Sequence, residues 1–181
     1  MKIGITIPNN WGVEDVHDVV ALGQRAEELG FDSVWTMDHL LNIGFVRDRL
    51  DNKPYYHPMG ILSFLAARTS RITLGTSVMV LPYHNPIELA KYSATLDQLS
   101  GGRFILGVGT GGMREESDVL GLELHRRGAI TNEMMCVMRE LWTADMPAFS
   151  GDKWRFDKLP FSPKPSCRCP ARRAAARPVQ T

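Results

Sequence analysis

His39 lies just after a predicted strand, a position where a side chain could take part in catalysis. His39 follows a short apolar run at residues 33–36 and opens the long segment of residues 38–57. An imidazole, with an ordinary pKa of about 6.5, can donate or accept a proton near neutral pH. Position and residue type alone fit a general acid–base role and a plain loop hydrogen bond equally well. His39 is therefore a candidate catalytic residue whose role must be decided by its surroundings.

Asp38 precedes this histidine and is a candidate cofactor-binding residue. Its carboxylate could accept a hydrogen bond from a bound cofactor, or it could fix the ring of His39. Aspartates also occur at such positions simply because they stabilise turns. Contact with a cofactor is the interpretation we prefer.

Glycines cluster at the end of the last apolar run, at Gly107, Gly109, Gly111 and Gly112. A residue without a Cβ lets the backbone approach a ligand closely, and exposed N–H groups can bind anionic oxygens. This run lacks the acidic partner and the surrounding pattern of a dinucleotide-binding motif. We expect Gly109, Thr110 and Gly111 to contact a cofactor, and a tight turn between strand and helix is compatible with that role.

The elements that must position these residues alternate between two periodicities. Short apolar runs rich in β-branched residues suit strands of a parallel sheet covered by helices. Between them, hydrophobic residues recur at a helical spacing, with Gly30 ending the first helix and Asn85 and Pro86 starting the third. The expected strands cover residues 3–7, 33–36, 72–80 and 104–108, and the expected helices lie near 16–29, 59–68, 85–99 and 130–141.

This alternation predicts an α/β fold with a parallel sheet. Two architectures satisfy it, a doubly wound open sheet and an eight-stranded barrel. The segment of residues 38–57 is far longer than a structural turn requires, so it indicates a functional loop at the end of a strand. That loop favours the barrel.

Composition narrows the function classes. The 181 residues suit about one domain, and the formal net charge of +1 gives no reason to expect a nucleic-acid partner. No apolar run approaches the roughly 20 residues needed to cross a bilayer, and the first residues read as a strand rather than a secretion signal. The histidines and the cysteines, Cys136, Cys167 and Cys169, lack the spacing of a metal site or a disulfide. We expect a cytoplasmic protein without a metal.

Seven segments form a pattern that is specific in its order and spacing: residues 26–35, 38–39, 74–82, 89–91, 94–103, 106–109 and 140–142. Together they resemble the luciferase-like family of flavin and deazaflavin oxidoreductases. The resemblance implies a (β/α)₈ TIM barrel with its cofactor at the C-terminal ends of the strands. It covers residues 1–165, which would form the N-terminal half of such a barrel, with about four βα units.

The resemblance also implies a cofactor. In the family, one strand carries a non-prolyl cis peptide that forms a bulge behind the flavin ring, and Ser77 and Val78 match that position. Together with Asp38 and His39, this pair resembles the branches that use the deazaflavin coenzyme F-420, which exchanges hydride but does not readily activate oxygen. An F-420-dependent oxidoreductase acting on a small organic substrate is implied. The alternative is an FMN-dependent monooxygenase that receives reduced flavin from a partner reductase.

Position 112 departs from the family pattern. Many relatives carry tryptophan or glutamate there, and in the sugar-phosphate dehydrogenase branch the glutamate acts as a base. Gly112 cannot do so, which puts that substrate class in doubt. Glu115 and Glu116 are nearby carboxylates that we expect to be solvated residues at the start of a helix.

The last residues, 166–181, have no periodicity and are rich in Arg, Ala and Pro. This composition predicts a disordered or out-of-frame tail, and it raises a third hypothesis, a non-catalytic truncated fragment. A half-barrel would expose sheet edges at its first and fourth strands. Pairing with a second copy would cover them, so we expect a homo-oligomer.

Overall fold

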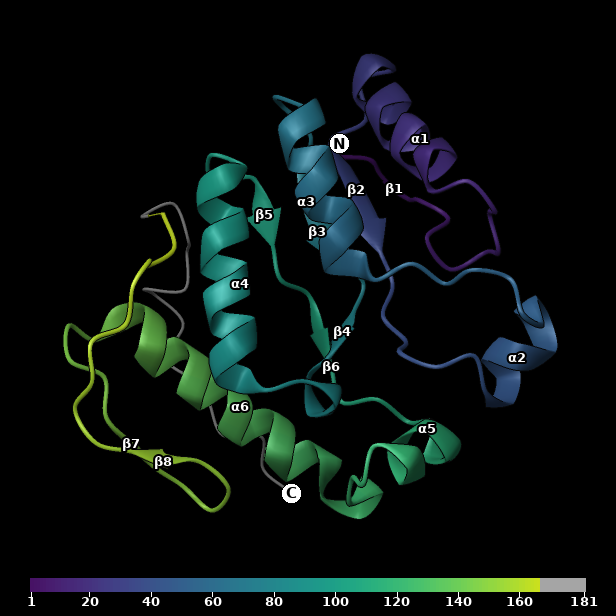
Figure 1. Cartoon of the computed structure of the whole chain (residues 1–181). Helices are drawn as coiled ribbons and strands as arrows, with labels where there is room; N and C mark the ends of the chain where they lie inside the picture. The colour runs from purple at the N-terminus through teal and green to yellow at the C-terminus, as the bar shows by residue number, and fades with distance from the viewer. Residues whose placement is uncertain (167–181) are drawn as a thin grey trace.

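The computed structural model describes residues 1–166, which form four strand–helix units followed by a small hairpin (Figure 1). Expectations for residues 167–181, including Cys167 and Cys169, lie outside the described residues. Ser166, the first residue of the expected tail, donates from its backbone N–H and its hydroxyl to Asp97, each at 2.6 Å.

The main sheet is parallel, and its strands lie in the order β1, β2, β3, β5. A second parallel pair, β4 with β6, continues the last two strands, and β7 and β8 form an antiparallel hairpin. The strands are β1 (Gly4–Thr6), β2 (Ser33–Thr36), β3 (Thr73–Thr76), β4 (Met79–Val80), β5 (Phe104–Ile105), β6 (Val108–Gly109), β7 (Phe149–Ser150) and β8 (Arg155–Phe156).

Helices α1, α3 and α4 stand side by side on one face of the main sheet, and α6 packs against α4 (Figure 1). Shorter helices lie at the ends of strands. The helices are α1 (Val16–Glu28), α2 (Gly44–Leu50), α3 (Pro58–Arg68), α4 (Pro86–Leu99), α5 (Arg114–Val119) and α6 (Arg127–Thr143), with 3₁₀ turns η1 (Leu81–Tyr83) and η2 (Leu124–Arg126). None of the helices in residues 1–166 has the length and apolar character needed to cross a membrane.

The helix ends follow the expected local chemistry. The carboxylate of Asp15 accepts the N–H of His17 at the start of α1. Asn85 accepts the N–H groups of Ile87 and Glu88, and Pro86 occupies the first turn of α4. Side-chain oxygens at these positions satisfy N–H groups that have no partner within the helix.

The core lies between the helices and one face of the sheet. Val34 and Leu74 are fully buried there against Leu62 and Leu65 of α3. Trp35 points to the opposite face, where Gly75 provides the space for its indole, because a Cβ at Gly75 would overlap the ring.

The structure differs from the sequence expectations in three respects: the continuity of two strands, a helix within the long loop, and the exposure of β1. The expected strands 72–80 and 104–108 are each interrupted, the first between Thr76 and Met79 and the second between Ile105 and Val108. The long loop of residues 38–57 contains a helix, α2. Strand β1 is exposed rather than buried on both faces, because it lies at an edge of the described sheet.

Two charged side chains tie the connections between helices and strands at the amino ends of the strands. The guanidinium of Arg103 donates to carbonyl oxygens of Ala66, Thr69, Ile72 and Ser100, so it joins the end of α3 to the starts of β3 and β5. Its NH1 also donates to the Thr69 hydroxyl. These bonds satisfy carbonyls that the end of a helix leaves without partners.

Glu27, in the last turn of α1, binds the turn that leads into β3. Its carboxylate accepts the backbone N–H groups of Ser70, Arg71 and Ile72 at 2.7–3.1 Å. Burial raises the pKa of Glu27, but the hydrogen bonds from Ile72, Arg71 and Ser70 outweigh it, so this pKa lies below its usual value. The ionised carboxylate is therefore the form that stabilises the fold.

We predict that Glu27→Gln lowers the free energy of unfolding by about 1 kcal/mol at neutral pH, since charge-assisted hydrogen bonds to a partly exposed group are weakened by solvent. A group with a depressed pKa stabilises the fold above its unfolded pKa of about 4.3, and this contribution is lost as the pH falls through the folded pKa. Urea unfolding at several pH values should show the two proteins converging in acid. The matched control is Glu28→Gln, which affects only an exposed ion pair with Arg25, and an equal effect of both variants would contradict the prediction.

Candidate active site

A cleft lies at the C-terminal ends of the strands. Its volume is about 520 Å³, which is within the range of roughly 300–1,000 Å³ typical of small-molecule sites. Its walls come from the loop after β2, the segment from Val78 to η1, and the loop between β6 and α5. The lining combines the apolar side chains of Phe45, Val78, Val80 and Met113 with the polar or charged side chains of His39, Tyr83, Arg114 and Glu115.

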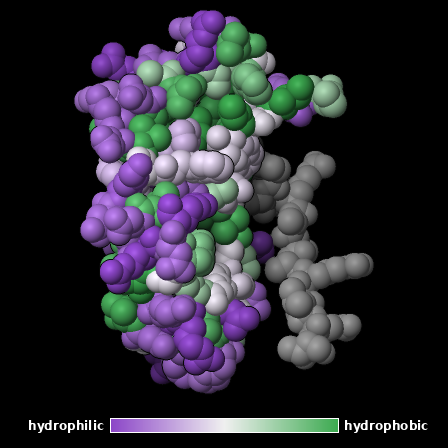
Figure 2. Space-filling model, turned by 90° about the vertical axis from the view of Figure 1, so that its right-hand side faces the viewer, coloured by the Kyte–Doolittle hydropathy of each residue, from purple (hydrophilic) through white to green (hydrophobic). Residues whose placement is uncertain are grey.

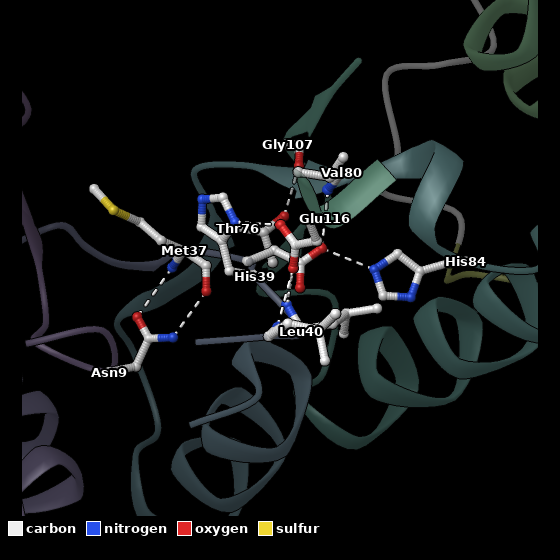
Figure 3. A network of polar contacts seen from close by, with 11 residues as sticks. Asn9, Met37, His39, Leu40, Thr76, Val80, His84, Gly107 and Glu116 are labelled. Atoms are coloured by element: carbon white, nitrogen blue, oxygen red, sulfur yellow. Dashed lines mark hydrogen bonds and ion pairs between the residues drawn. The ribbon is translucent and has the colours of Figure 1, made fainter. Parts of the chain in front are cut away.

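His39 reaches the cleft with one ring nitrogen already bonded. Its Nδ1 lies 2.6 Å from Oε2 of Glu116, and the Glu116 side chain is completely buried (Figure 3). The other carboxylate oxygen, Oε1, accepts the backbone N–H of Leu40 at 2.6 Å and of Leu41 at 3.0 Å. A single carboxylate thus holds both the ring of His39 and the backbone that follows it.

Electrostatics keep this carboxylate ionised. Burial raises the pKa of Glu116, but the hydrogen bonds from His39, Leu40 and Leu41 outweigh it, and the net pKa lies below the usual range. The pKa of the Tyr83 hydroxyl is raised by burial and by the nearby charge of Glu116. Tyr83 is therefore a neutral phenol on the wall of the cleft.

Asp38 lies beneath the cleft rather than in its wall. It is 3% exposed, and its Oδ2 accepts the backbone N–H of Val80 at 2.9 Å and Nε2 of His84 at 2.7 Å (Figure 3). Its Oδ1 is buried and has no hydrogen-bond partner among residues 1–166. Asp38 thus ties the end of β2 to β4. Burial lowers the pKa of the neighbouring His57, whose ring lies 6.1 Å from that of His84.

Asn9, which follows β1, forms hydrogen bonds with the backbone just before Asp38. Its amide donates to the carbonyl of Met37 at 2.8 Å and to that of Tyr56 at 2.8 Å, and its Oδ1 accepts the N–H of Met37 at 3.0 Å. Because Met37 precedes Asp38, these bonds fix the backbone from which both Asp38 and His39 project (Figure 3).

The peptide bond between Ser77 and Val78 is cis, which confirms that expectation. It lies in the interruption between β3 and β4. The side chain of Val78 lines the cleft, and the backbone N–H of Ser77 donates to the carbonyl of Thr36 at 2.7 Å. The segment is further held by the Thr76 hydroxyl and the Met79 N–H, which both bond to the carbonyl of Gly107 at 2.7 and 2.8 Å.

The glycines after β5 permit close packing against this segment. A Cβ on Gly109 would come within 2.6 Å of Val78, and one on Gly111, where φ is +69°, within 2.6 Å of Val80. Gly111 and Gly112 line the cleft, and a Cβ on Gly112 would meet nothing within 4 Å. Thr110 is exposed and its hydroxyl bonds only to the carbonyl of Gly111 among the described residues.

The structure therefore gathers the sequence candidates at one end of the sheet, but not all in one wall. His39, Val78 and Gly111 line the cleft, Ser77 and Gly109 support it, and Asp38 lies below. The expectation that Glu116 is solvated is wrong, because α5 turns its side chain inward to His39. No signal in the sequence distinguishes Glu116 from its neighbour Glu115, and none points to Asn9 or His84.

Residues 1–166 contain no group of His, Cys, Asp or Glu that could hold a metal ion.

Comparison with known proteins identifies the family. The family described as luciferase-like monooxygenase matches residues 1–180, and the chain belongs to this family. Its parallel α/β fold is accordingly of the TIM-barrel type.

Individual relatives point to two kinds of chemistry. An F-420-dependent glucose-6-phosphate dehydrogenase of Amycolatopsis mediterranei is 37% identical over 166 residues, which cover 90% of this chain and 48% of that protein. An F-420-dependent secondary alcohol dehydrogenase, solved with an F-420–acetone adduct, is 29% identical, with a TM-score of 0.73 over 91% of this chain and 50% of that one. A monooxygenase from Streptomyces bottropensis is 26% identical, with a TM-score of 0.77 and the same coverage. The chain spans about half the length of the curated relatives it matches.

The packing of the glycines yields a prediction about stability. In Gly107→Ala the new Cβ would overlap the carbonyl oxygen of Thr76, which is backbone and cannot move aside. We expect a loss of about 2 kcal/mol or more in the free energy of unfolding, measured by urea denaturation.

The matched control is Gly112→Ala, which lies five residues further on, in the loop after β6, and has open space at its Cβ. It should change the free energy of unfolding by less than about 0.5 kcal/mol. Equal stability of the two variants would show that Gly107 does not pack against Thr76 as described.

Proposed function

We propose that residues 1–165 form the N-terminal, cofactor-binding half of an F-420-dependent oxidoreductase that acts on a small organic substrate. The observation that carries the proposal is the pairing of His39 with buried Glu116 at a cleft that is also lined by Val78 of the cis Ser77–Val78 bond. The resemblance to two F-420-dependent dehydrogenases supports it.

The residues of the cleft fit a planar, largely apolar ring. Val78, Val80 and Met113 offer apolar contact, and the glycines keep side chains out of the space in front of Val78. We propose that Ser77, Val78, Gly109, Thr110 and Gly111 bind the deazaflavin. Bound there, the deazaflavin would supply hydride acceptance and donation.

In this proposal His39 handles the proton that accompanies hydride transfer. Its ring is only partly exposed, 20% for the side chain, so it can meet a substrate oxygen in the cleft while Glu116 holds its other nitrogen. Asp38, which we expected to contact the cofactor, would act by holding Val80 in place. Glucose 6-phosphate, the substrate named for one relative, is not proposed here because Gly112 offers no side-chain base.

An FMN-dependent monooxygenase, supplied by a partner flavin reductase, is the second candidate. The structural likeness to the Streptomyces bottropensis monooxygenase favours it. Consumption of oxygen with reduced FMN would distinguish it from F-420 chemistry.

We also propose that the chain associates with a second copy. Ile5 in β1 and Ile105 in β5, the two edge strands, are 38% and 48% exposed. Hydrophobic residues also gather in the upper part of the side shown in Figure 2. Burying such apolar surface would favour association. The non-catalytic fragment and the cytoplasmic location stay predictions from the sequence.

The proposal predicts that the purified chain binds F-420 in a saturable fluorescence titration, and more tightly than it binds FMN. With an alcohol that it oxidises, His39→Gln should lower the rate of F-420 reduction by at least about 100-fold, since general acid–base groups contribute roughly 10²–10⁴. Binding of F-420 should persist in this variant.

The control is His17→Gln, because His17 lies on α1 and does not line the cleft. It should leave both binding and rate unchanged. Absence of F-420 binding by a chain that circular dichroism shows to be folded would overturn the proposal, and tighter binding of FMN would favour the monooxygenase.

A further inference from the structure

The carboxylate that bonds to His39, behind the cleft lining, belongs to Glu116, which the sequence gave no reason to select. Its side chain is completely buried, although it comes from α5, a helix of only six residues. Both oxygens are used, Oε2 by the ring of His39 and Oε1 by the N–H groups of Leu40 and Leu41. Every one of these partners lies in the three residues that follow Asp38, so the carboxylate acts on one short stretch of backbone.

The chemistry of this contact fixes where the proton of the imidazole must be. An ionised carboxylate can only accept hydrogen bonds, whereas each nitrogen of a neutral imidazole is either a donor or an acceptor. At 2.6 Å from Oε2, Nδ1 of His39 must therefore be the protonated nitrogen. In the neutral ring, Nε2 then carries the lone pair.

Neighbouring side chains hold the ring in that orientation. Phe45 and Tyr55 each meet the imidazole edge to face, with ring centroids at 5.3 and 5.8 Å. Neither of these contacts competes for Nδ1. Nε2 has no partner among the described residues, and His39 lines the cleft.

We propose that Glu116 is a positioning residue that fixes His39 as its Nδ1–H tautomer and so leaves Nε2 as the nitrogen that accepts a proton from the substrate. The proposal rests on the proposed function, in which His39 takes part in proton transfer. Its second action, through Leu40 and Leu41, anchors the backbone from which the imidazole projects. Ring and backbone are then preorganised by the same group, which removes the need to order them during the reaction.

The test reads the ring directly and needs neither cofactor nor substrate. Long-range ¹⁵N–¹H correlation spectra of the unmodified chain, taken at alkaline pH where the imidazole is neutral, distinguish the two tautomers of His39. We expect Nδ1 to show the shift of a protonated nitrogen and Nε2 that of an unprotonated one. The opposite assignment would overturn the proposal even if the chain binds F-420, and the correct assignment would stand even if it does not.

The variant Glu116→Gln then tests whether Glu116 sets the tautomer of His39. In Glu116→Gln the amide oxygen can still accept the N–H groups of Leu40 and Leu41, while the amide nitrogen faces Nδ1 and donates to it. The tautomer should invert to Nε2–H, and an oxidation rate that depends on Nε2 as acceptor should fall by about 100-fold with little change in KM. Glu115→Gln is the matched control, since this neighbour is exposed on the rim, and it should keep the Nδ1–H tautomer.

Retention of the Nδ1–H tautomer in folded Glu116→Gln would show that another group sets it and would overturn the proposal. If this variant does not fold, the tautomer of the unmodified chain still decides, because the Nε2–H form is incompatible with the contact to Glu116.

Discussion

Two buried carboxylates, Asp38 just after β2 and Glu116 in α5, are the constraint on which the cleft depends. Asp38 and Glu116 have completely buried side chains. Each bonds to a histidine ring nitrogen, and each accepts backbone N–H groups, one at Asp38 and two at Glu116. Burying a charge is costly unless it is paired and hydrogen-bonded, so the surrounding loops can satisfy these groups in few arrangements. The loop after β2, strand β4 and helix α5 are in this way tied to one another.

The Asp38–His84 pair supports the structure beside the cleft, and the Glu116–His39 pair positions the candidate catalytic histidine. Asp38 bonds to His84 and to the backbone of Val80, whereas Glu116 bonds to His39, whose side chain lines the cleft. Because Asp38 and His39 are adjacent in sequence and point to different partners, one short stretch of backbone connects both pairs. Asn9, bonded to Met37, fixes the start of that stretch.

Local signals in the sequence predicted much of the fold. The N-cap at Asn85 and the apolar spacing of the helices depend on near neighbours, and the structure confirms the α/β order and the parallel sheet. The cis bond at Ser77–Val78 was predictable only through resemblance to a family, since no local pattern indicates it. Glu116 could not be selected because its partner His39 lies 77 residues away and only the fold brings them together. For the same reason, the bond of Asp38 to His84 was hidden.

Amide hydrogen exchange tests the central claim most directly, because both carboxylates act on identifiable backbone N–H groups. If Asp38 and Glu116 hold the strand ends as described, the amides of Leu40, Leu41 and Val80 should exchange at least about 100-fold more slowly than that of Thr110, which is exposed in the same region. Exchange of all three at the rate of Thr110, in a chain whose core amides are protected, would contradict the account.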